Sequence, residues 1–489
     1  MKIRFLLSNW LFYTTIFVIF VVFFSFIHPI VPYDTDDWWF MGIDRPSYPS
    51  ISSWNPSKIF PERFEPFVSI LGGYLIVPLV EDYINGITLT NAIIVSLFII
   101  IYLWLVQKFI EFRFPINKLT SHCLIALFIV FHFLILRTDK ENNDYLWYTH
   151  DAACYYHYII PSLLCASMIL WLMRNDICRL KKGRVIALLI PLFYLAICSN
   201  LYSSVIIISY IGSALLQDLK KSKFVNKLFG SWFICFIRRN IPYFLILILW
   251  GIVQWYEVNG SRASYSSLHK PFFHCLKVTV HNFYSFRYNL WFLFVAVLAL
   301  SGAKLIDYLH SRHNIWYIGY WQITIRLSLF FSTAYLVLLS SRVNPTYIQR
   351  SDIIFSYAFF FLLLVILALA YLCTHIRYMG MSMPLLFFFL LFLVNTPGKT
   401  FKDVIEEYNP DLQTCINIDR EIVQQILDAD ANGLDSVTIN VPTYSKHSYN
   451  WPIMVTDYAS QYYGHTLYLH NQTKREIKTI FIPTYVIDL

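Results

Sequence analysis

Charged residues are scarce in this chain, and several sequence patterns of soluble enzymes are missing from it. Only 14% of its 489 residues are Asp, Glu, Lys or Arg. It has no glycine-rich phosphate loop, no nucleophile elbow and no His/Cys pattern with metal-ligand spacing. Internal repeats, low-complexity tracts and flexible linkers are also missing. Its nine cysteines are scattered, and we interpret most of them as packing residues.

Long apolar runs are what the chain has instead. It is 57% hydrophobic and 19% aromatic, whereas soluble domains are roughly 45–50% apolar. Apolar stretches of about 20 residues are long enough to cross a bilayer. We therefore predict an all-α polytopic membrane protein with about eleven transmembrane helices. They are expected near residues 10–31, 86–107, 119–136, 155–173, 185–199, 202–217, 241–256, 289–308, 321–341, 353–373 and 380–396.

The stretch from Phe67 to Val80 is left out of this count. It is short and holds Gly72, Gly73 and Pro78, which favours an interfacial or re-entrant helix. The strongly basic loops then share the side of the N-terminus, which the positive-inside rule makes cytoplasmic. The net charge of +8 thus reflects orientation and gives no indication of nucleic-acid binding.

The same arrangement places several loops and the C-terminal tail on the outer face. We predict a transmembrane domain over residues 1–396, with outer loops 33–66, 137–154, 257–288 and 342–352. Residues 397–489 are predicted to form a small α/β domain on that face. Asp419 to Leu427 has helical spacing, and Ser436 to Val441 alternates like a strand after the Asn432-Gly433 turn.

An acidic cluster directly follows the first span. Asp34, Asp36 and Asp37 fall within four residues, where each carboxylate would lose solvation near lipid. One of them would serve as a general base, or the group would hold a divalent cation. The alternative is an ordinary acidic helix cap followed by an aromatic belt at Trp38-Trp39.

Three further groups are candidates for substrate binding. Glu62, Arg63 and Glu65 precede the short apolar helix and would line an acceptor groove, or else form a solvated helix start. His150 and Asp151 lie in the polar aromatic segment from Trp147 to Pro161, which suits sugar stacking or a membrane interface. On the outer face, Arg342 and Arg350 would bind a phosphate, or extend to lipid headgroups.

These features together resemble the GT-C class of membrane glycosyltransferases, which use a polyprenyl-phosphate sugar. The arrangement of Asp36-Asp37-Trp38, Glu62-Arg63, the segment from Trp147 to Pro161 and the outer tail is similar to the O-antigen glucosyltransferases of serotype conversion in bacteria and phages. The resemblance covers the layout of most of the chain. Its motifs are short.

The resemblance implies a function in the bacterial inner membrane, with a cytoplasmic N-terminus and a periplasmic C-terminal domain. It implies inverting transfer of glucose from undecaprenyl phosphate glucose to lipid-linked O-antigen. Asp36 or Asp37 would be the base, with Asp34 still open, and Arg342 or Arg350 would neutralise the leaving phosphate. No cofactor is required, although a divalent cation is compatible. Expected partners are membrane lipid, a bactoprenol glucosyltransferase and a flippase.

Two other function classes share this layout. A transporter or flippase of a lipid-linked or polar solute would carry charges at mid-membrane depth and usually repeated halves, whereas Arg326 is one of few such charges here. An O-antigen polymerase or ligase would also have many spans and large outer loops.

Overall fold

The structure, a computed structural model, is mostly helical. It describes residues 2–32, 35–43, 54–136, 145–149, 151–175, 177, 183–223, 229–260, 272–286, 288–312, 319–343, 345–394, 412–443 and 457–486. The chain divides into two compact units. The first comprises Met1–Ile100, Thr149–Ile160 and Ile405–Leu489, and the second comprises Ile101–Tyr148 and Pro161–Val404. The predicted domain boundary at residue 397 stays a prediction.

The first unit combines the N-terminal helices with the C-terminal segment. Its elements are α1 (Lys2–Val22), the π-helix η1 (Phe23–Ile27), α2 (Thr35–Gly42), α3 (Pro61–Leu75), α4 (Val77–Val80), the first part of α5 (Tyr83–Arg113), α7 (Ala152–Cys154), the π-helix η2 (Tyr155–Ile159), α19 (Leu412–Ala431), β1 (Ser436–Thr443), α20 (Asp457–Leu469) and β2 (Lys478–Val486).

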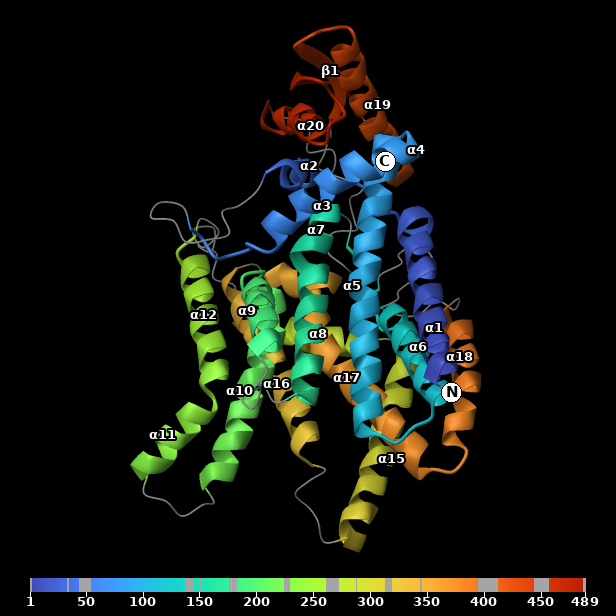
Figure 1. Cartoon of the computed structure of the whole chain (residues 1–489), viewed down its shortest axis with the longest axis vertical. Coiled ribbons are helices and arrows are strands. Elements are labelled where there is room, and N and C mark those ends of the chain that lie inside the picture. Colours follow the sequence, from blue (N-terminus) through green and yellow to red (C-terminus); the bar gives the residue numbers. More distant parts are fainter. Residues whose placement is uncertain are drawn as a thin grey trace. The chain divides into compact units, whose positions relative to one another are not determined.

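The second unit is helical throughout its described part. It holds the rest of α5, then α6 (Lys118–Leu134), α8 (Ile160–Arg174), α9 (Gly183–Ile197), α10 (Leu201–Lys223), α11 (Phe229–Arg239), α12 (Ile241–Val258), α14 (Phe272–Ser285), α15 (Tyr288–Arg312), α16 (Gly319–Arg342), the 3₁₀-helix η5 (Pro345–Gln349), α17 (Ser351–His375) and α18 (Met379–Val394) (Figure 1).

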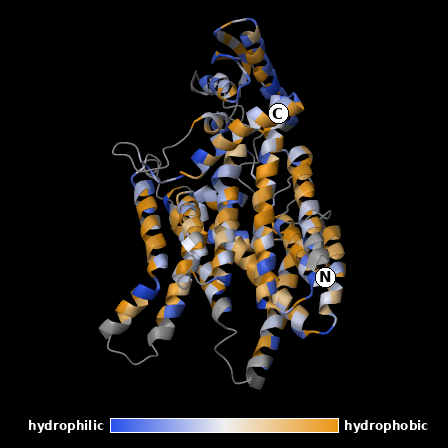
Figure 2. Ribbon diagram, in the orientation of Figure 1, coloured by the Kyte–Doolittle hydropathy of each residue, from blue (hydrophilic) through white to orange (hydrophobic). Residues whose placement is uncertain are grey.

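Seven helices in the described part of the chain are long and apolar enough to cross a membrane. They are Asn9–Ile27, Tyr83–Arg113, Ala152–Arg174, Leu201–Leu219, Ile241–Val258, Gln322–Arg342 and Ser351–His375. Three apolar helices are shorter, at Lys118–Leu134, Val185–Ile197 and Met379–Phe392. In Figure 2 the hydrophobic colour runs along α1, α5 and α12, whereas α19 is largely hydrophilic. The prediction of a helical polytopic membrane protein is confirmed at this level.

Helix α17 forms the centre of the second unit. It is apolar around its whole circumference, and a helix of that kind is stable only when neighbours or lipid surround it. Here α6, α10, α15, α16 and α18 pack against it, and it is buried over nearly its entire length.

The stretch from Phe67 to Val80 does not form one long helix. It lies in α3 and the short α4, and Glu81 then ends α4 in a left-handed conformation (φ 60°). Neither helix is among the candidate spans of the described residues.

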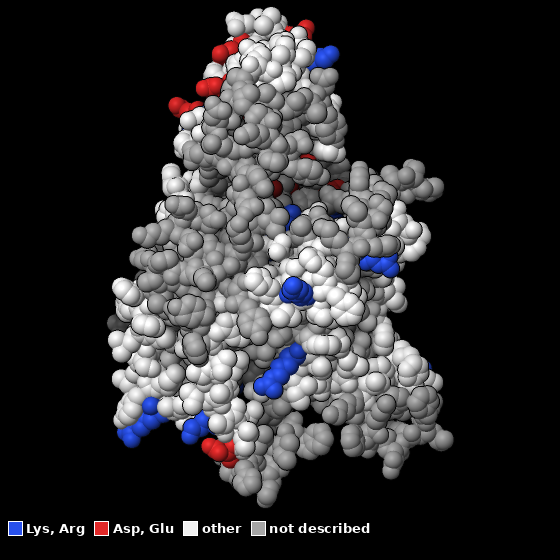
Figure 3. Space-filling view, turned by 180° about the vertical axis from the view of Figure 1, so that it is seen from behind, with Lys and Arg blue, Asp and Glu red and all other residues white. Residues whose placement is uncertain are grey.

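The C-terminal segment of the first unit is an α/β structure. Strands β1 and β2 pair in parallel, with Ser436 opposite Lys478, and α20 connects them. The predicted helix and strand are confirmed as α19 and β1, and Gly433 provides the turn between them with φ +75°. Neither α20 nor β2 was predicted from the sequence. Figure 3 shows carboxylates over this segment, where Glu421, Asp428 and Asp435 are exposed.

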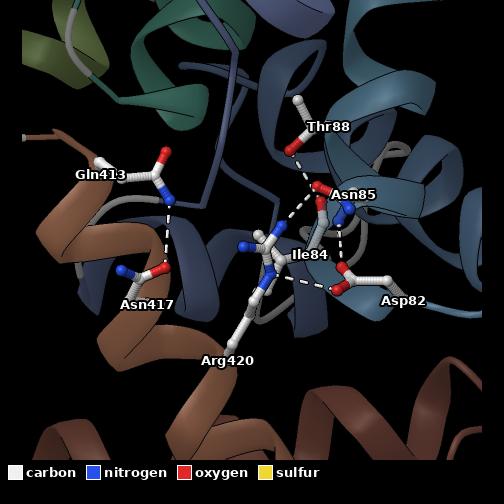
Figure 4. A network of polar contacts seen from close by, with 7 residues as sticks. All are labelled: Asp82, Ile84, Asn85, Thr88, Gln413, Asn417 and Arg420. Atoms are coloured by element: carbon white, nitrogen blue, oxygen red, sulfur yellow. Dashed lines mark hydrogen bonds and ion pairs between the residues drawn. The ribbon is translucent and has the colours of Figure 1, made fainter.

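Helix α19 is tied to the start of α5 by one arginine. Arg420 donates from Nε to Asp82 at 3.1 Å and from Nη2 to the Asn85 side chain at 2.7 Å (Figure 4). Asp82 also accepts the backbone N–H of Asn85 at 2.7 Å, so it caps α5 while binding Arg420. Residues of α2, α5, α19, α20 and both strands also share one hydrophobic core. The C-terminal segment is therefore packed against the N-terminal elements of the first unit.

Candidate functional site

Helix α2 places two adjacent aspartates in different environments. Asp36 and Asp37 both occupy its first turn, where the helix dipole favours negative charge. The Asp36 side chain is exposed, whereas Asp37 is completely buried. Only Asp36 of this pair can meet a substrate from solvent without a rearrangement.

Asp37 connects α2 to the start of another helix. Its Oδ1 accepts the backbone N–H of Ala153 at 2.6 Å, and Asp151 accepts the N–H of Cys154 at 2.5 Å. Both N–H groups belong to the first turn of the helical run α7–η2–α8 and would otherwise lack intrahelical acceptors. Asp37 therefore has a structural task that fixes where α2, and with it Asp36, lies.

Helix α3 contributes two more carboxyl groups, those of Glu62 and Glu65. Glu65 is completely buried, and neither of its carboxylate oxygens has a hydrogen-bond partner among the described residues. Glu62 is almost as buried on the same helix, with Arg63 half-buried beside it. Burial without a hydrogen-bond partner disfavours the ionised form of Glu65 and favours its protonated form.

Four other carboxyl groups act electrostatically on Glu65. Burial raises the pKa of Glu65 well above its usual value, and the negative charges of Asp37, Asp151, Asp36 and Glu62 raise it further. We refer to Asp36, Asp37, Glu62, Glu65 and Asp151 as the acidic cluster. The structure thus gathers five of the residues predicted from separate sequence segments into one part of the first unit.

Glu65→Gln is expected to stabilise the protein at neutral and alkaline pH. The unfolded chain ionises this group near its ordinary pKa, whereas the folded chain must keep the proton, so stability contributed here falls as pH rises above about 4.5. Glutamine is neutral and nearly isosteric, and it removes that dependence. The unfolding temperature of the purified chain at pH 5, 7 and 9 should fall less steeply in this variant. Glu421→Gln, on the exposed face of α19, is the matched control, and its unfolding temperature should depend on pH as that of the original protein does. The same pH dependence in the original protein and in both variants would contradict a raised pKa of Glu65.

Aromatic side chains hold the elements of the cluster together. The Phe64 ring contacts those of Phe98 and Tyr156 at centroid distances of 5.7 and 6.0 Å. The Tyr156 hydroxyl donates to Asn91 Oδ1 at 2.9 Å. Tyr156 lies in the π-helical turn η2, a wide turn that is frequent at functional sites. These contacts fix α3 against α5 and η2.

The C-terminal segment also holds α2, which the sequence did not indicate. Thr466 Oγ1 donates to the backbone carbonyl of Trp38 at 2.9 Å. The ring of Trp38 stacks on Tyr463 at 4.0 Å, and that of Trp39 stacks on Tyr462 at 5.3 Å. Trp38 is fully buried, so the interpretation of Trp38-Trp39 as an aromatic belt is wrong for Trp38. Both tryptophans instead pack against α20.

His470 extends this contact to α3. Its Nδ1 accepts a hydrogen bond from the Tyr83 hydroxyl at 2.8 Å. Its Nε2 then carries the proton and donates to the Met41 carbonyl at 3.4 Å. Burial lowers its pKa to about 4, so the ring is neutral at physiological pH. Gly73 of α3 packs so closely that a Cβ there would lie 2.5 Å from His470 Cβ. The helices that carry Asp36 and Glu65 are thus both packed against the C-terminal segment.

The two candidate arginines belong to the second unit. Arg342 is exposed at the end of α16. Arg350 forms a two-pronged ion pair with Asp352, with Nη2 at 2.6 Å and Nε at 3.1 Å from the carboxylate oxygens. Asp352 is 3% exposed. The Arg350 guanidinium thus neutralises a buried carboxylate at the start of α17, and its predicted role in binding a phosphate stays a prediction. The same prediction for Arg342 remains a prediction.

Arg350→Ala is expected to destabilise the protein by about 3 kcal/mol or more, because it leaves the Asp352 charge buried without its partner. The unfolding temperature of the purified variant measures this loss. Arg350→Ala combined with Asp352→Asn removes both charges and should recover much of it. Arg342→Ala, at an exposed position, should unfold like the original protein. An unaltered unfolding temperature for Arg350→Ala would show that the ion pair contributes nothing.

Two predicted residues, Asp34 and His150, lie outside the described residues. Within the described part of the chain, no group of three or more His, Cys, Asp and Glu side chains has the geometry to hold a metal ion. The divalent cation considered from the sequence stays a prediction.

The candidate site therefore consists of the exposed Asp36 and of neighbouring carboxyl groups that are buried, except for the half-buried Asp151. Comparison with protein-family models, with curated proteins and with solved structures finds no match for this chain.

Proposed function

We propose that the chain is an inverting glycosyltransferase that moves glucose from undecaprenyl phosphate glucose to a sugar hydroxyl of lipid-linked O-antigen. The observation that carries the proposal is the acidic cluster, in which Asp36 is exposed beside carboxyl groups buried in the same unit. A reaction of this kind needs a positioned base and no protein nucleophile.

The proposed reaction involves one proton transfer and one displacement. Asp36 removes the proton from the acceptor hydroxyl as its oxygen attacks the anomeric carbon of glucose. The bond between that carbon and the phosphate oxygen breaks, and undecaprenyl phosphate leaves with the electron pair. Attack opposite the leaving phosphate inverts the anomeric configuration. Asp37 keeps α2 in place through Ala153 and acts as a positioning residue.

A neutral acceptor hydroxyl suits this environment. The exposed Asp36 carboxylate can accept the proton of that hydroxyl as the hydroxyl oxygen attacks. The leaving phosphate needs a positive charge, which an arginine side chain can supply. A divalent cation is an alternative source of that positive charge.

The proposed topology has eleven crossings of the bacterial inner membrane in a GT-C-like fold. Seven candidate spans, three shorter apolar helices and α15 coincide with the eleven predicted segments. The N-terminus would then be cytoplasmic, and the C-terminal segment periplasmic together with loop 33–66. Reporter fusions within loop 33–66 and after residue 400 should report the same side. Opposite sides would mean that α3 and α4 cross the membrane.

The deciding experiment uses the full chain purified into proteoliposomes. Undecaprenyl phosphate glucose labelled in the glucose and lipid-linked O-antigen are supplied together, and label in the acceptor polysaccharide is measured. Transfer with inversion at the anomeric carbon, established by NMR of the product, is the expected result. Movement of intact donor across the bilayer without transfer would favour a flippase. Joining of polysaccharide chains without added hexose would favour a polymerase or ligase.

A further inference from the structure

A polar cavity lies entirely within the second unit. Its volume is about 260 Å³, and three arginines line it: Arg113 at the end of α5, Arg174 at the end of α8, and Arg239 at the end of α11. Asp218 of α10 is the one carboxylate among its lining residues in the described part. Helix C-termini also carry partial negative charge, which favours arginine there but does not explain why three converge on one cavity.

Two of the arginines are held in place by protein groups. Arg113 donates from Nη2 to the Met173 carbonyl at 2.9 Å, and its guanidinium lies over the rings of Phe109 and Phe112. Arg239 lies 3.5 Å from Asp218. Such contacts keep these side chains at the cavity wall instead of extended into solvent.

Arg174 is different, because no described residue neutralises it. Its Nε is buried and makes no hydrogen bond within the described part of the chain. The one lining carboxylate, Asp218, is already used: Asn240 donates to it at 2.9 Å and Arg239 pairs with it. Three guanidinium groups thus meet one carboxylate among the described lining residues, so the cavity wall carries an excess of positive charge, and the Arg174 Nε–H is unused there.

We propose that this cavity binds a phosphate-type oxyanion, carried either by a membrane lipid headgroup or by a small soluble phosphate. Guanidinium groups match phosphate oxygens in paired hydrogen bonds. The cavity is smaller than the roughly 300–1,000 Å³ typical of drug-sized ligand sites, so a headgroup or a small phosphate fits it. Its wall combines these arginines with apolar side chains such as Met173, which suits a headgroup with an attached chain. The proposal does not depend on the transfer reaction.

The test measures the unfolding temperature of the full chain in detergent as anions are added. One arm titrates dioleoylphosphatidylglycerol against dioleoylphosphatidylcholine, and the other titrates inorganic phosphate against chloride at equal ionic strength. Stabilisation by phosphatidylglycerol alone identifies a lipid headgroup, and stabilisation by inorganic phosphate as well identifies a soluble ligand. The proposal is overturned if phosphatidylcholine stabilises the protein as much as phosphatidylglycerol does and chloride stabilises it as much as phosphate does.

Variants distinguish anion binding in the cavity from general attraction of anions to the positively charged protein. Arg174→Gln should raise the half-saturating concentration about tenfold, and Arg174→Lys should restore part of the affinity. Arg239→Gln is a second probe. Because the Arg239 side chain is half-exposed, this substitution disturbs folding less than Arg174→Gln does. The control is Arg377→Gln, an exposed arginine after α17 that does not line the cavity. Equal affinities in Arg174→Gln, Arg239→Gln and Arg377→Gln would overturn the site.

Discussion

Replacing Asp36 by asparagine is expected to lower glucose transfer by about a hundredfold or more, the usual loss when a general base is removed. The side chain is exposed at the N-terminal turn of α2, so the isosteric change leaves packing intact. The initial rate of label transfer to lipid-linked O-antigen, in proteoliposomes with matched protein content, measures the effect. An unchanged unfolding temperature would show that the loss is chemical.

Asp37→Asn distinguishes the base from its neighbour. Asparagine keeps an oxygen that accepts the Ala153 N–H, so α2 should stay in place and transfer should fall much less than in Asp36→Asn. Asp428→Asn, at an exposed position of α19, is the control and should be fully active. If Asp37→Asn is inactive while Asp36→Asn is active, Asp37 is the base and Asp36 the positioning residue. Full activity in both, and in Asp34→Asn, would end the catalytic interpretation of the cluster.

The apolar segments were predictable because crossing a bilayer imposes a length and a composition on each one separately. The positions of α5, α10, α12, α16 and α17 follow from that local rule. The same reasoning explains why α19 and β1 were found, since each has its own periodicity and Gly433 separates them. In contrast, β2 is a strand because it pairs with β1 from more than thirty residues away, with α20 between them, and no local pattern encodes that pairing.

The acids of the site were predictable, but their environments were not. Scarcity of charge singled out Asp36, Asp37, Glu62, Glu65 and Asp151. What distinguishes Asp36 from Asp37 is the Ala153 N–H, which only the folded chain brings to α2.

Arg350 shows the same limit at short range. It lies two residues from Asp352 in the sequence, but the geometry of their pair depends on how the turn before α17 is built.

Gly464→Ala is expected to disrupt the candidate site without touching any acid. A Cβ at this position of α20 would lie 2.0 Å from the Ile477 carbonyl oxygen and 2.9 Å from Thr479 Oγ1. Because the first of these is backbone next to β2, either α20 or the strand must move. Overpacking of this kind costs about 1–3 kcal/mol, and α20 is the helix whose Thr466 and Tyr463 hold Trp38. Transfer should therefore fall about tenfold or more, since small displacements of catalytic groups have large effects on rate.

The readout must separate a displaced α20 from general unfolding. Limited proteolysis should cleave the C-terminal segment sooner in Gly464→Ala, while fragments from the second unit keep their original resistance. Gly212→Ala is the matched control, because no atom lies within 4 Å of a Cβ there, and alanine should be neutral or slightly stabilising in α10. If Gly464→Ala releases the C-terminal segment to protease and still transfers glucose at the original rate, α20 does not position Asp36. If both the rate and the protease resistance fall together, the packing of Trp38 on Tyr463 is the physical link between a distant segment and the exposed base.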